Sequence, residues 1–212
     1  MTHPRLRDIA MASAVLAGLA SLSACAPLLI GGAVFGGSMV AVDRRTSGAQ
    51  LEDEAIELKA PKRISDAIGD RGSVSVTSYN RIVLLTGTVP TDADKGAVEQ
   101  GVARIENVKS VVNELATGAT ISLGTRSNDA LLTSKVKASL IDAKDIQVNS
   151  VKVVTERGIV YLMGRVTERE ANRTAEIARG VGGVQKVVKV FEVVSEAELA
   201  DLPAKPAEPA KP

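Results

Sequence analysis

The most regular hydrophobic pattern in the chain occurs twice. Residues 74–89 read VSVTSYNRIVLLTGTV and residues 151–166 read VKVVTERGIVYLMGRV, and the two align without a gap. In each copy an alternating apolar and polar run leads to a two-residue polar break, Asn80-Arg81 or Arg157-Gly158, and a second run rich in β-branched residues follows. This pattern predicts a β-hairpin. The chain therefore contains two copies of one small module.

Helical periodicity flanks each hairpin. Ile56, Ala60, Ile64 and Ile68 recur every four residues before the first hairpin, as on one face of a helix, although Pro61 is expected to kink or interrupt it. Comparable patterns, together with β-rich runs after each crossover, predict helices over residues 51–68, 91–105, 129–142 and 168–181 and strands over residues 108–115 and 184–194.

Each unit therefore has the order α-β-β-α-β, and the fold class is α+β with a three-stranded mixed sheet packed on two helices in each domain. The hairpin strands are antiparallel, and the helical crossover makes the third strand parallel to one of them. Val111-Val112 aligns with Val187-Val188 after a slip of one residue within the crossover. Gly87 and Gly164 are expected at equivalent strand ends, where a side chain would meet close-packed backbone.

The domains are assigned to residues 46–116 and 126–194, with a linker over residues 117–125. Each has about 70 residues, a size at which a single core stabilises only marginally. With aromatic residues at only 2%, the cores must be aliphatic. The two domains are therefore expected to lean on each other.

The N-terminus has the features of an export signal, assigned to residues 1–24. Arg5 and Arg7 precede a mostly apolar run over residues 9–22. Leu22-Ser23-Ala24-Cys25 follows and resembles the bacterial lipobox, in which the cysteine is lipidated. Cys25 is the only cysteine, so no intramolecular disulfide can form. Because Ala26 and not Asp follows it, the resemblance to Gram-negative sorting implies a lipid anchor in the outer membrane, with the protein facing the periplasm.

Two segments are expected to have no packed role. Residues 25–45 begin with the lipidated cysteine and continue as a Gly-rich apolar tether, too short to span a bilayer. Residues 195–212 end in LPAKPAEPAKP, a Pro/Ala-rich composition that predicts a disordered extended tail.

The residues for catalysis are missing, so we expect no enzyme, no metal site and no cofactor. The only histidine is His3, in the segment expected to be removed, and Cys25 is expected to be acylated. Neither a His/Cys metal site nor a Ser-His or Cys-His pair can be assembled. The acidic cluster Glu52, Asp53, Glu54 and Glu57 is explained by the dipole at a helix start. Nucleic-acid binding would require a stronger basic stripe with aromatic residues.

The charge is unevenly divided. Residues 46–118 carry 8 Lys+Arg and 11 Asp+Glu, a net charge of −3, whereas residues 119–194 carry 12 and 8, a net charge of +4. The second domain is therefore the one suited to an anionic partner, although charge scattered over two solvated surfaces explains the difference equally well.

The helix expected over residues 129–142, for which Ser127, Asn128 and Asp129 offer capping groups, has two distinct faces. One face, with Leu132, Val136 and Leu140, is the core face. The opposite face is formed by Leu131, Ser134, Lys135, Ala138 and Ile141. Exposed aliphatic side chains beside a lysine are typical of a shallow membrane-interface patch. Alternatively, Leu131 packs on the other domain or on the tether.

The order of elements and several motifs resemble the BON domain, a bacterial module of periplasmic and osmotically induced proteins. The stretches that carry the resemblance are Ser127-Asn128-Asp129 with Thr133-Ser134-Lys135-Val136, and Val160-Tyr161-Leu162-Met163-Gly164 with Val166-Thr167-Glu168-Arg169-Glu170-Ala171. Two such units behind a lipobox and a Gly-rich tether resemble outer-membrane lipoproteins of the DolP type.

The resemblance implies a non-enzymatic envelope lipoprotein that supports outer-membrane integrity. It also implies binding of an anionic phospholipid, phosphatidylglycerol or cardiolipin, through the first helix of the second domain, on which family members can carry an aromatic residue where this chain has Leu131. The alternative is a periplasmic protein-interaction adaptor for an envelope assembly or cell-division complex. The class of partner stays open between lipid and protein, and nucleic acid is not expected.

Overall fold

A computed structural model of the chain describes residues 43–200, which all belong to one compact unit. The expected signal peptide, the lipidation site Cys25, most of the tether and residues 201–212 lie outside these described residues. Within residues 43–200, no helix has the length and hydropathy that a membrane crossing requires.

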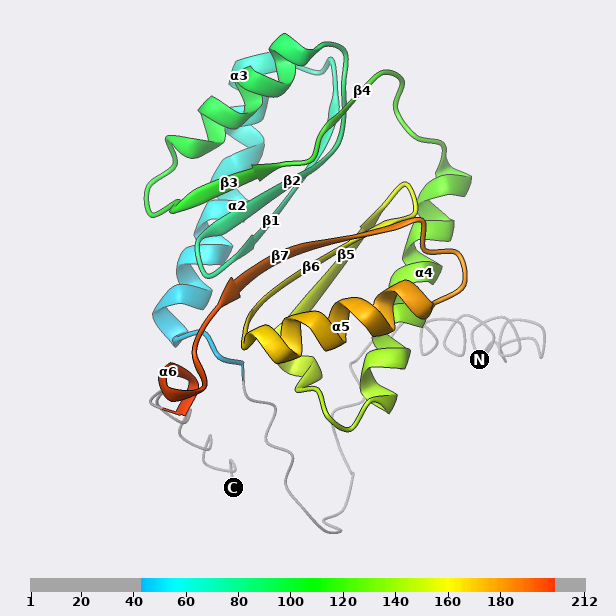
Figure 1. Cartoon of the computed structure of the whole chain (residues 1–212). Helices are drawn as coiled ribbons and strands as arrows, with labels where there is room; N and C mark the ends of the chain where they lie inside the picture. Colours follow the sequence, from blue (N-terminus) through cyan, green and yellow to red (C-terminus); the bar gives the residue numbers. More distant parts are fainter. Residues whose placement is uncertain (1–42, 201–212) are drawn as a thin grey trace, which may run out of the picture. The chain divides into compact units, whose positions relative to one another are not determined.

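The described chain folds as two successive α-β-β-α-β domains, which confirms the expected fold class (Figure 1). The first domain consists of α2 (Ser47–Ile68), β1 (Ser73–Tyr79), β2 (Ile82–Val89), α3 (Asp92–Ala103), β3 (Ser110–Asn113) and β4 (Ala116–Thr117). The second consists of α4 (Leu123–Asp142), the 3-10 turn η2 (Val148–Ser150), β5 (Val151–Glu156), β6 (Ile159–Val166), α5 (Glu168–Gly180) and β7 (Lys186–Val193), followed by α6 (Glu196–Ala200).

Both sheets are mixed, with the second hairpin strand in the centre. β2 pairs antiparallel with β1 and parallel with β3, and β6 pairs in the same way with β5 and β7. Val83 pairs with Val111 and Val160 with Val187, which confirms the one-residue slip in the crossover. The first sheet differs from the expected three strands because its third strand breaks near Leu115, and β4 resumes the parallel pairing with β2.

A buried carboxylate from the first helix of each domain holds the hairpin turn of that domain. Asp53 in α2 accepts hydrogen bonds from both backbone N–H groups of Asn80-Arg81 at 2.7 Å, and Asp129 in α4 accepts them from Arg157-Gly158 at 2.8 Å. All four turn residues have positive φ, between 49° and 75°, as a two-residue turn of type I′ requires. The carboxylate therefore stabilises a turn in which three residues other than glycine adopt the left-handed conformation.

This contact corrects two expectations. The acidic cluster that includes Asp53 does not lie at a helix start, because α2 begins at Ser47, capped by Thr46, and has no acidic residue in its first turn. Asp129 likewise is not a cap but an interior residue of α4, with only 4% of its surface exposed. Both residues serve a contact with the hairpin that lies about 28 residues further along the chain.

Two other segments are more ordered than their composition predicts. α2 continues through Pro61 without interruption. At the C-terminal end, residues 196–200 form the short helix α6 instead of extended chain, with the side chain of Glu198 bonded to the Ser195 backbone N–H at 2.9 Å.

Three apolar clusters account for the packing. The first two lie between each sheet and its own helices, and the second contains Val136 and Leu140 of α4. All three core residues expected on α4, including Leu132, are 3% exposed or less. The third joins the opposite faces of the two sheets through Tyr79, Leu84, Tyr161, Met163 and Val190. The two domains therefore share a core, as their small size led us to expect.

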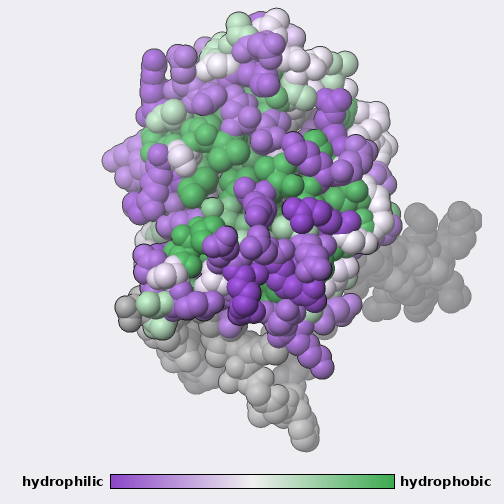
Figure 2. All heavy atoms as spheres, in the orientation of Figure 1, coloured by the Kyte–Doolittle hydropathy of each residue, from purple (hydrophilic) through white to green (hydrophobic). Residues whose placement is uncertain are grey.

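Apolar atoms of the sheets also reach the surface. In the view of Figure 2 polar side chains cover most of the face, and apolar atoms gather in a band across its middle, where β3 and β7 lie. Val112 in β3 and Val188 in β7 are partly buried members of the third cluster.

An ion pair fixes the start of the described chain to the second domain. Arg44 donates to both carboxylate oxygens of Glu170 at 2.7 and 2.8 Å, and both side chains are more than 90% buried. Arg44 also donates to the backbone carbonyl of Arg165 at 3.0 Å. The hydrogen bonds from Arg44 lower the pKa of Glu170 below its ordinary value, and the Thr167 N–H adds to this effect.

The next residue binds the first domain. Arg45 donates to Asp53 at 2.8 Å, and its guanidinium lies 4.3 Å from the centre of the Tyr79 ring. Residues 43–45, assigned to the tether from composition, are therefore anchored to both domains.

The two strand glycines occupy the positions expected of them. A Cβ atom on Gly87 would lie 2.1 Å from the backbone oxygen of Ser73, and one on Gly164 would lie 2.3 Å from that of Ser150. Ser73 is the first residue of β1, and Ser150 directly precedes β5. The two glycines are therefore equivalent. In both domains backbone approaches backbone too closely for a side chain.

We predict that Gly87→Ala and Gly164→Ala each lower the free energy of unfolding by roughly 2 kcal/mol or more, because a strand must shift to admit the methyl group. Thermal and urea unfolding measure the change. Gly96→Ala in α3 is the matched control, because no atom lies within 4 Å of its added Cβ; it should be neutral or slightly stabilising. Equal stability of Gly87→Ala and Gly96→Ala would contradict the proposed close approach.

We also predict that Glu170→Gln destabilises the protein by about 3 kcal/mol, because it leaves the buried Arg44 without its counter-charge. Gln still serves the N-terminal capping box of α5, so the helix itself is preserved. Since the folded-state pKa of Glu170 is lowered, its contribution is present above the ordinary value of 4.5 and is lost as the pH falls below it.

Urea unfolding across this pH range should show wild type and Glu170→Gln converging in stability at acidic pH. The control is Glu168→Gln, in the exposed first turn of the same helix. A stability difference between wild type and Glu170→Gln that does not shrink on acidification would argue against the ion pair.

Candidate membrane-binding surface

The helix that carries the expected site is two turns longer than its periodicity predicts. α4 begins at Leu123, because the side chain of Ser122 accepts a hydrogen bond from the Thr125 N–H at 3.1 Å and caps the helix there. The Ser127-Asn128-Asp129 stretch lies inside the helix. The helix is anchored on one side by its core residues and by Asp129, which leaves its other side to solvent.

All five residues expected on the outer face of α4 are exposed. Leu131 exposes 54% of its surface and Ile141 exposes 66%. Ser134, Lys135 and Ala138 lie between them and are also exposed. Lys135 takes part in none of the ion pairs found in residues 43–200, so its charge is available to a ligand.

The longer helix adds one residue that sequence reasoning missed. Leu123 exposes 81% of its surface, and at 100° per residue it falls on the same side of the helix as Ile141. Leu123, Leu131 and Ile141 therefore mark an apolar stripe about 27 Å long, from a rise of 1.5 Å per residue. We call these three residues, with Ser134, Lys135 and Ala138, the α4 stripe. Ser122, a residue type favoured as a helix N-cap, was the sequence signal that could have revealed the earlier start of α4 and hence Leu123.

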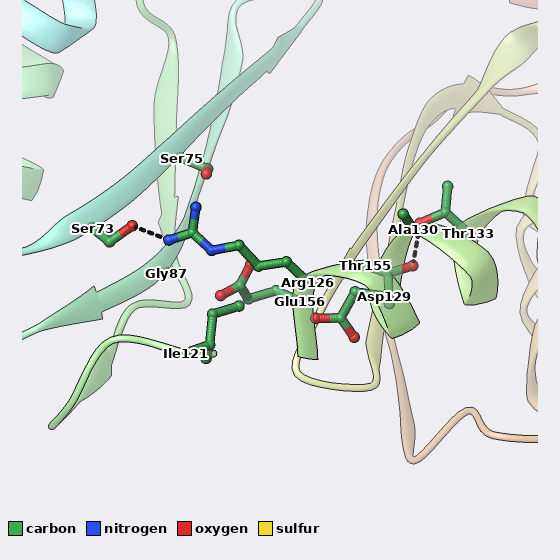
Figure 3. A pocket seen from close by; sticks show the side chains of 10 residues that line it. All are labelled: Ser73, Ser75, Gly87, Ile121, Arg126, Asp129, Ala130, Thr133, Thr155 and Glu156. Carbon is green, nitrogen blue, oxygen red and sulfur yellow. Dashed lines mark hydrogen bonds between the residues drawn. The ribbon is translucent and has the colours of Figure 1, made fainter. Parts of the chain in front are cut away.

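Another side of α4 lines a cleft of about 270 Å³ (Figure 3). Arg126 extends from α4 towards β1 and donates to the Ser73 hydroxyl at 3.0 Å, and Thr133 donates to Thr155 at 2.7 Å. The residues that line the cleft are Ser73, Ser75, Gly87, Ile121, Arg126, Asp129, Ala130, Thr133, Thr155 and Glu156.

The charges in this cleft do not suit an anion. Burial raises the pKa of Glu156, and the nearby Asp129 carboxylate adds to this increase. The charged residues that line the cleft are two acidic ones, Asp129 and Glu156, and the single guanidinium of Arg126. An anionic headgroup would meet net negative charge here, whereas on the α4 stripe it would meet a lysine. The stripe is the better candidate for an acidic lipid.

The described residues hold no group of three or more His, Cys, Asp or Glu side chains placed to bind a metal ion. Two residues of the acidic cluster on α2 serve contacts within the fold. Asp53 binds the first hairpin turn, and Glu57 accepts from the Ser78 N–H at 2.7 Å and from Lys152 at 3.0 Å.

Comparison with known proteins identifies the class. The BON domain pattern matches residues 52–119 and 128–195, and each match spans one α-β-β-α-β domain. The chain therefore belongs to the BON-domain family and carries two BON domains in tandem.

Among individual proteins, the outer membrane lipoprotein DolP of Haemophilus influenzae is 37% identical over 187 residues, which cover 87% of this chain and 95% of DolP. The 21 kDa hemolysin of Actinobacillus pleuropneumoniae is 36% identical over 145 residues, covering 68% of this chain and 75% of the relative. The osmotically-inducible protein Y of Escherichia coli K12 is 28% identical over 142 residues, covering 65% and 71%. The similarity extends over nearly the whole length of DolP. It confirms the expectation that this chain is an outer-membrane lipoprotein.

Proposed function

We propose that this lipoprotein binds anionic phospholipid through the α4 stripe of its second BON domain and thereby supports the integrity of the outer membrane. The observation that carries the proposal is the exposure of Leu123, Leu131 and Ile141 along one side of α4, beside the unpaired Lys135. The net charge of +4 over residues 119–194 adds attraction to an acidic surface.

The energies favour weak, reversible binding by the domain alone. Each basic residue near an anionic membrane contributes about 1 kcal/mol, which salt screens. Full burial of a leucine side chain contributes about 1.5–3 kcal/mol, and shallow insertion only part of that. An acyl anchor on Cys25 raises the concentration of the domain at the bilayer, so that weak binding suffices.

The first domain has a comparable helix but not the same surface. Leu58 on α2 is 82% exposed, yet residues 46–118 carry a net charge of −3, which an acidic bilayer repels. The charge difference between the domains therefore supports lipid binding by the second domain.

We predict that the chain from Ala26 onward, without lipid, floats with phosphatidylglycerol or cardiolipin vesicles and not with neutral vesicles. Leu131→Glu and Lys135→Glu should each weaken the association by about tenfold, because each replaces a favourable contact by a repelled charge. Higher salt should weaken it as well.

The matched control is Leu58→Glu, which places the same change on an exposed leucine of the first domain. Thermal unfolding verifies that each variant is folded. If Leu58→Glu reduces flotation as much as Leu131→Glu, net charge and not the α4 stripe determines binding, and the site is wrong.

The anchor is tested separately. We predict that Cys25→Ala leaves the precursor unprocessed by the lipoprotein route, because acylation needs the thiol of the only cysteine. Stable anchoring takes two signals or more, since one acyl chain gives only marginal binding. Metabolic labelling with palmitate and the electrophoretic size of the product measure the outcome. An acylated product of mature size from Cys25→Ala would exclude this site.

A further inference from the structure

One edge of the first sheet presents unpaired backbone groups. β1 pairs only with β2, so its other side is a free edge. The two-residue turn makes Tyr79 and Ile82 a hydrogen-bonded pair, and in an antiparallel ladder such pairs alternate with pairs that do not exchange hydrogen bonds. Ser78, Val76 and Val74 therefore direct their N–H and C=O groups away from β2.

Only one end of this edge is occupied. The Ser78 N–H donates to Glu57 at 2.7 Å, and the Ser78 carbonyl accepts from Lys152 at 3.3 Å. For the outward groups of Val74 and Val76, residues 43–200 supply no comparable hydrogen bond. Two donors and two acceptors therefore remain available in the middle of the strand.

These groups border a groove of about 350 Å³ between the strand edge and α2. It is lined by Glu57, Pro61, Ile64, Ser65, Gly69, Asp70, Gly72, Val74 and Val76. Pro61 has no N–H, so the carbonyl of Glu57, four residues earlier, lacks its helical donor. An edge strand beside a helix is an arrangement that takes up an extended peptide as an additional strand.

The edge also lacks the usual protection against such pairing. Proteins blunt edge strands with lysine, proline or bulges. β7, an edge of the second sheet, carries Lys186 and Lys189, whereas β1 reads SVSVTSY and pairs with β2 without a bulge. An open edge without these features is a site at which another chain can pair.

We propose that the β1 edge binds an extended cationic segment of a partner protein by strand addition. Two charged residues line the groove, and both are acidic. Glu57 is already paired with Lys152 at 3.0 Å, whereas Asp70 takes part in none of the ion pairs found in residues 43–200. The charge of Asp70 favours a basic residue in the bound segment. Because only Val74 and Val76 offer free outward groups, only a short segment of the partner pairs with β1. The interaction is therefore weak and reversible.

Other occupants fit these features less well. A second copy of the chain would bring a second acidic groove to the first, and like charges repel. Residues 201–212 contain a proline at every third position from Pro203, and proline cannot donate to a ladder. Residues 28–42 of the tether are uncharged and gain nothing from the acidic lining.

The probe is the labelled peptide acetyl-Lys-Val-Lys-Val-Lys-Val-amide, titrated into the chain from Ala26 onward. We expect saturable binding, slowed hydrogen exchange at the amides of Val74 and Val76, and weaker binding in high salt. A peptide with proline in place of its central valine should bind at least about tenfold more weakly, because it loses backbone pairing.

Two variants test the site. Val76→Pro removes an outward N–H without breaking a bond to β2, and we expect at least about a tenfold loss of affinity. Its matched control is Val153→Pro, the equivalent outward position in β5. Asp70→Lys changes only an exposed side chain, so it tests the charge even if the proline variants do not fold; Asp66→Lys, on the exposed surface of α2 outside the groove, is its control.

Unchanged affinity of folded Val76→Pro or of Asp70→Lys would overturn the proposal, as would slowed exchange at other strands only. Binding by a chain that starts at Asp43 but not by the chain from Ala26 would assign the groove to the tether instead. Self-association through β1 that the peptide does not reverse would assign it to a second copy. Vesicle flotation of Val76→Pro and Asp70→Lys should stay unchanged, which separates this site from the α4 stripe.

Discussion

Each domain depends on a central strand whose two faces both have to be covered. All residues of β2 after Ile82 are buried, and β6 is almost as fully enclosed. Helices cover one face of each strand, and the remaining faces, with Leu84 and Met163, can leave water only by meeting each other. At roughly 25 cal/mol per Å² of apolar surface, exposing either face would exceed the margin that a small domain possesses. The tandem arrangement is therefore a requirement of packing as well as a repetition in sequence.

This requirement determines which surfaces remain for function. The core consumes the inner sides of the helices and both faces of the sheets, so the available surfaces are the outer sides of helices and the edges of sheets. The α4 stripe is an example of the first and the β1 edge of the second. They differ in charge, because one belongs to the basic domain and the other to the acidic domain. The two proposed ligands, a lipid surface and a cationic peptide, would therefore not compete for the same groups.

Local periodicity was sufficient for the hairpins and the inner face of α4, because these follow from contacts between near neighbours. The crossover slip spans 27 or 28 residues and was predicted from the alignment of the two copies. The start of α4 was predicted two turns too late, since Ser122 and the Ser127-Asn128 pair are equally good caps in isolation and only tertiary packing selects between them. The roles of Asp53 and Asp129 were missed because their partners lie about 28 residues away. Arg44 and Glu170 lie 126 residues apart, so no periodic pattern in the sequence predicts their ion pair.

The anchoring of Arg44 and Arg45 has a mechanical consequence. If the lipid is on Cys25, the segment that connects it to Asp43 is 18 residues long. Such a segment can place Asp43 at most about 60 Å from the lipid. The C-terminal end of this segment is bound to both domains, because Arg44 pairs with Glu170 of the second domain and Arg45 pairs with Asp53 of the first. A pull from such an anchor would therefore act on both domains at once and not on one of them alone.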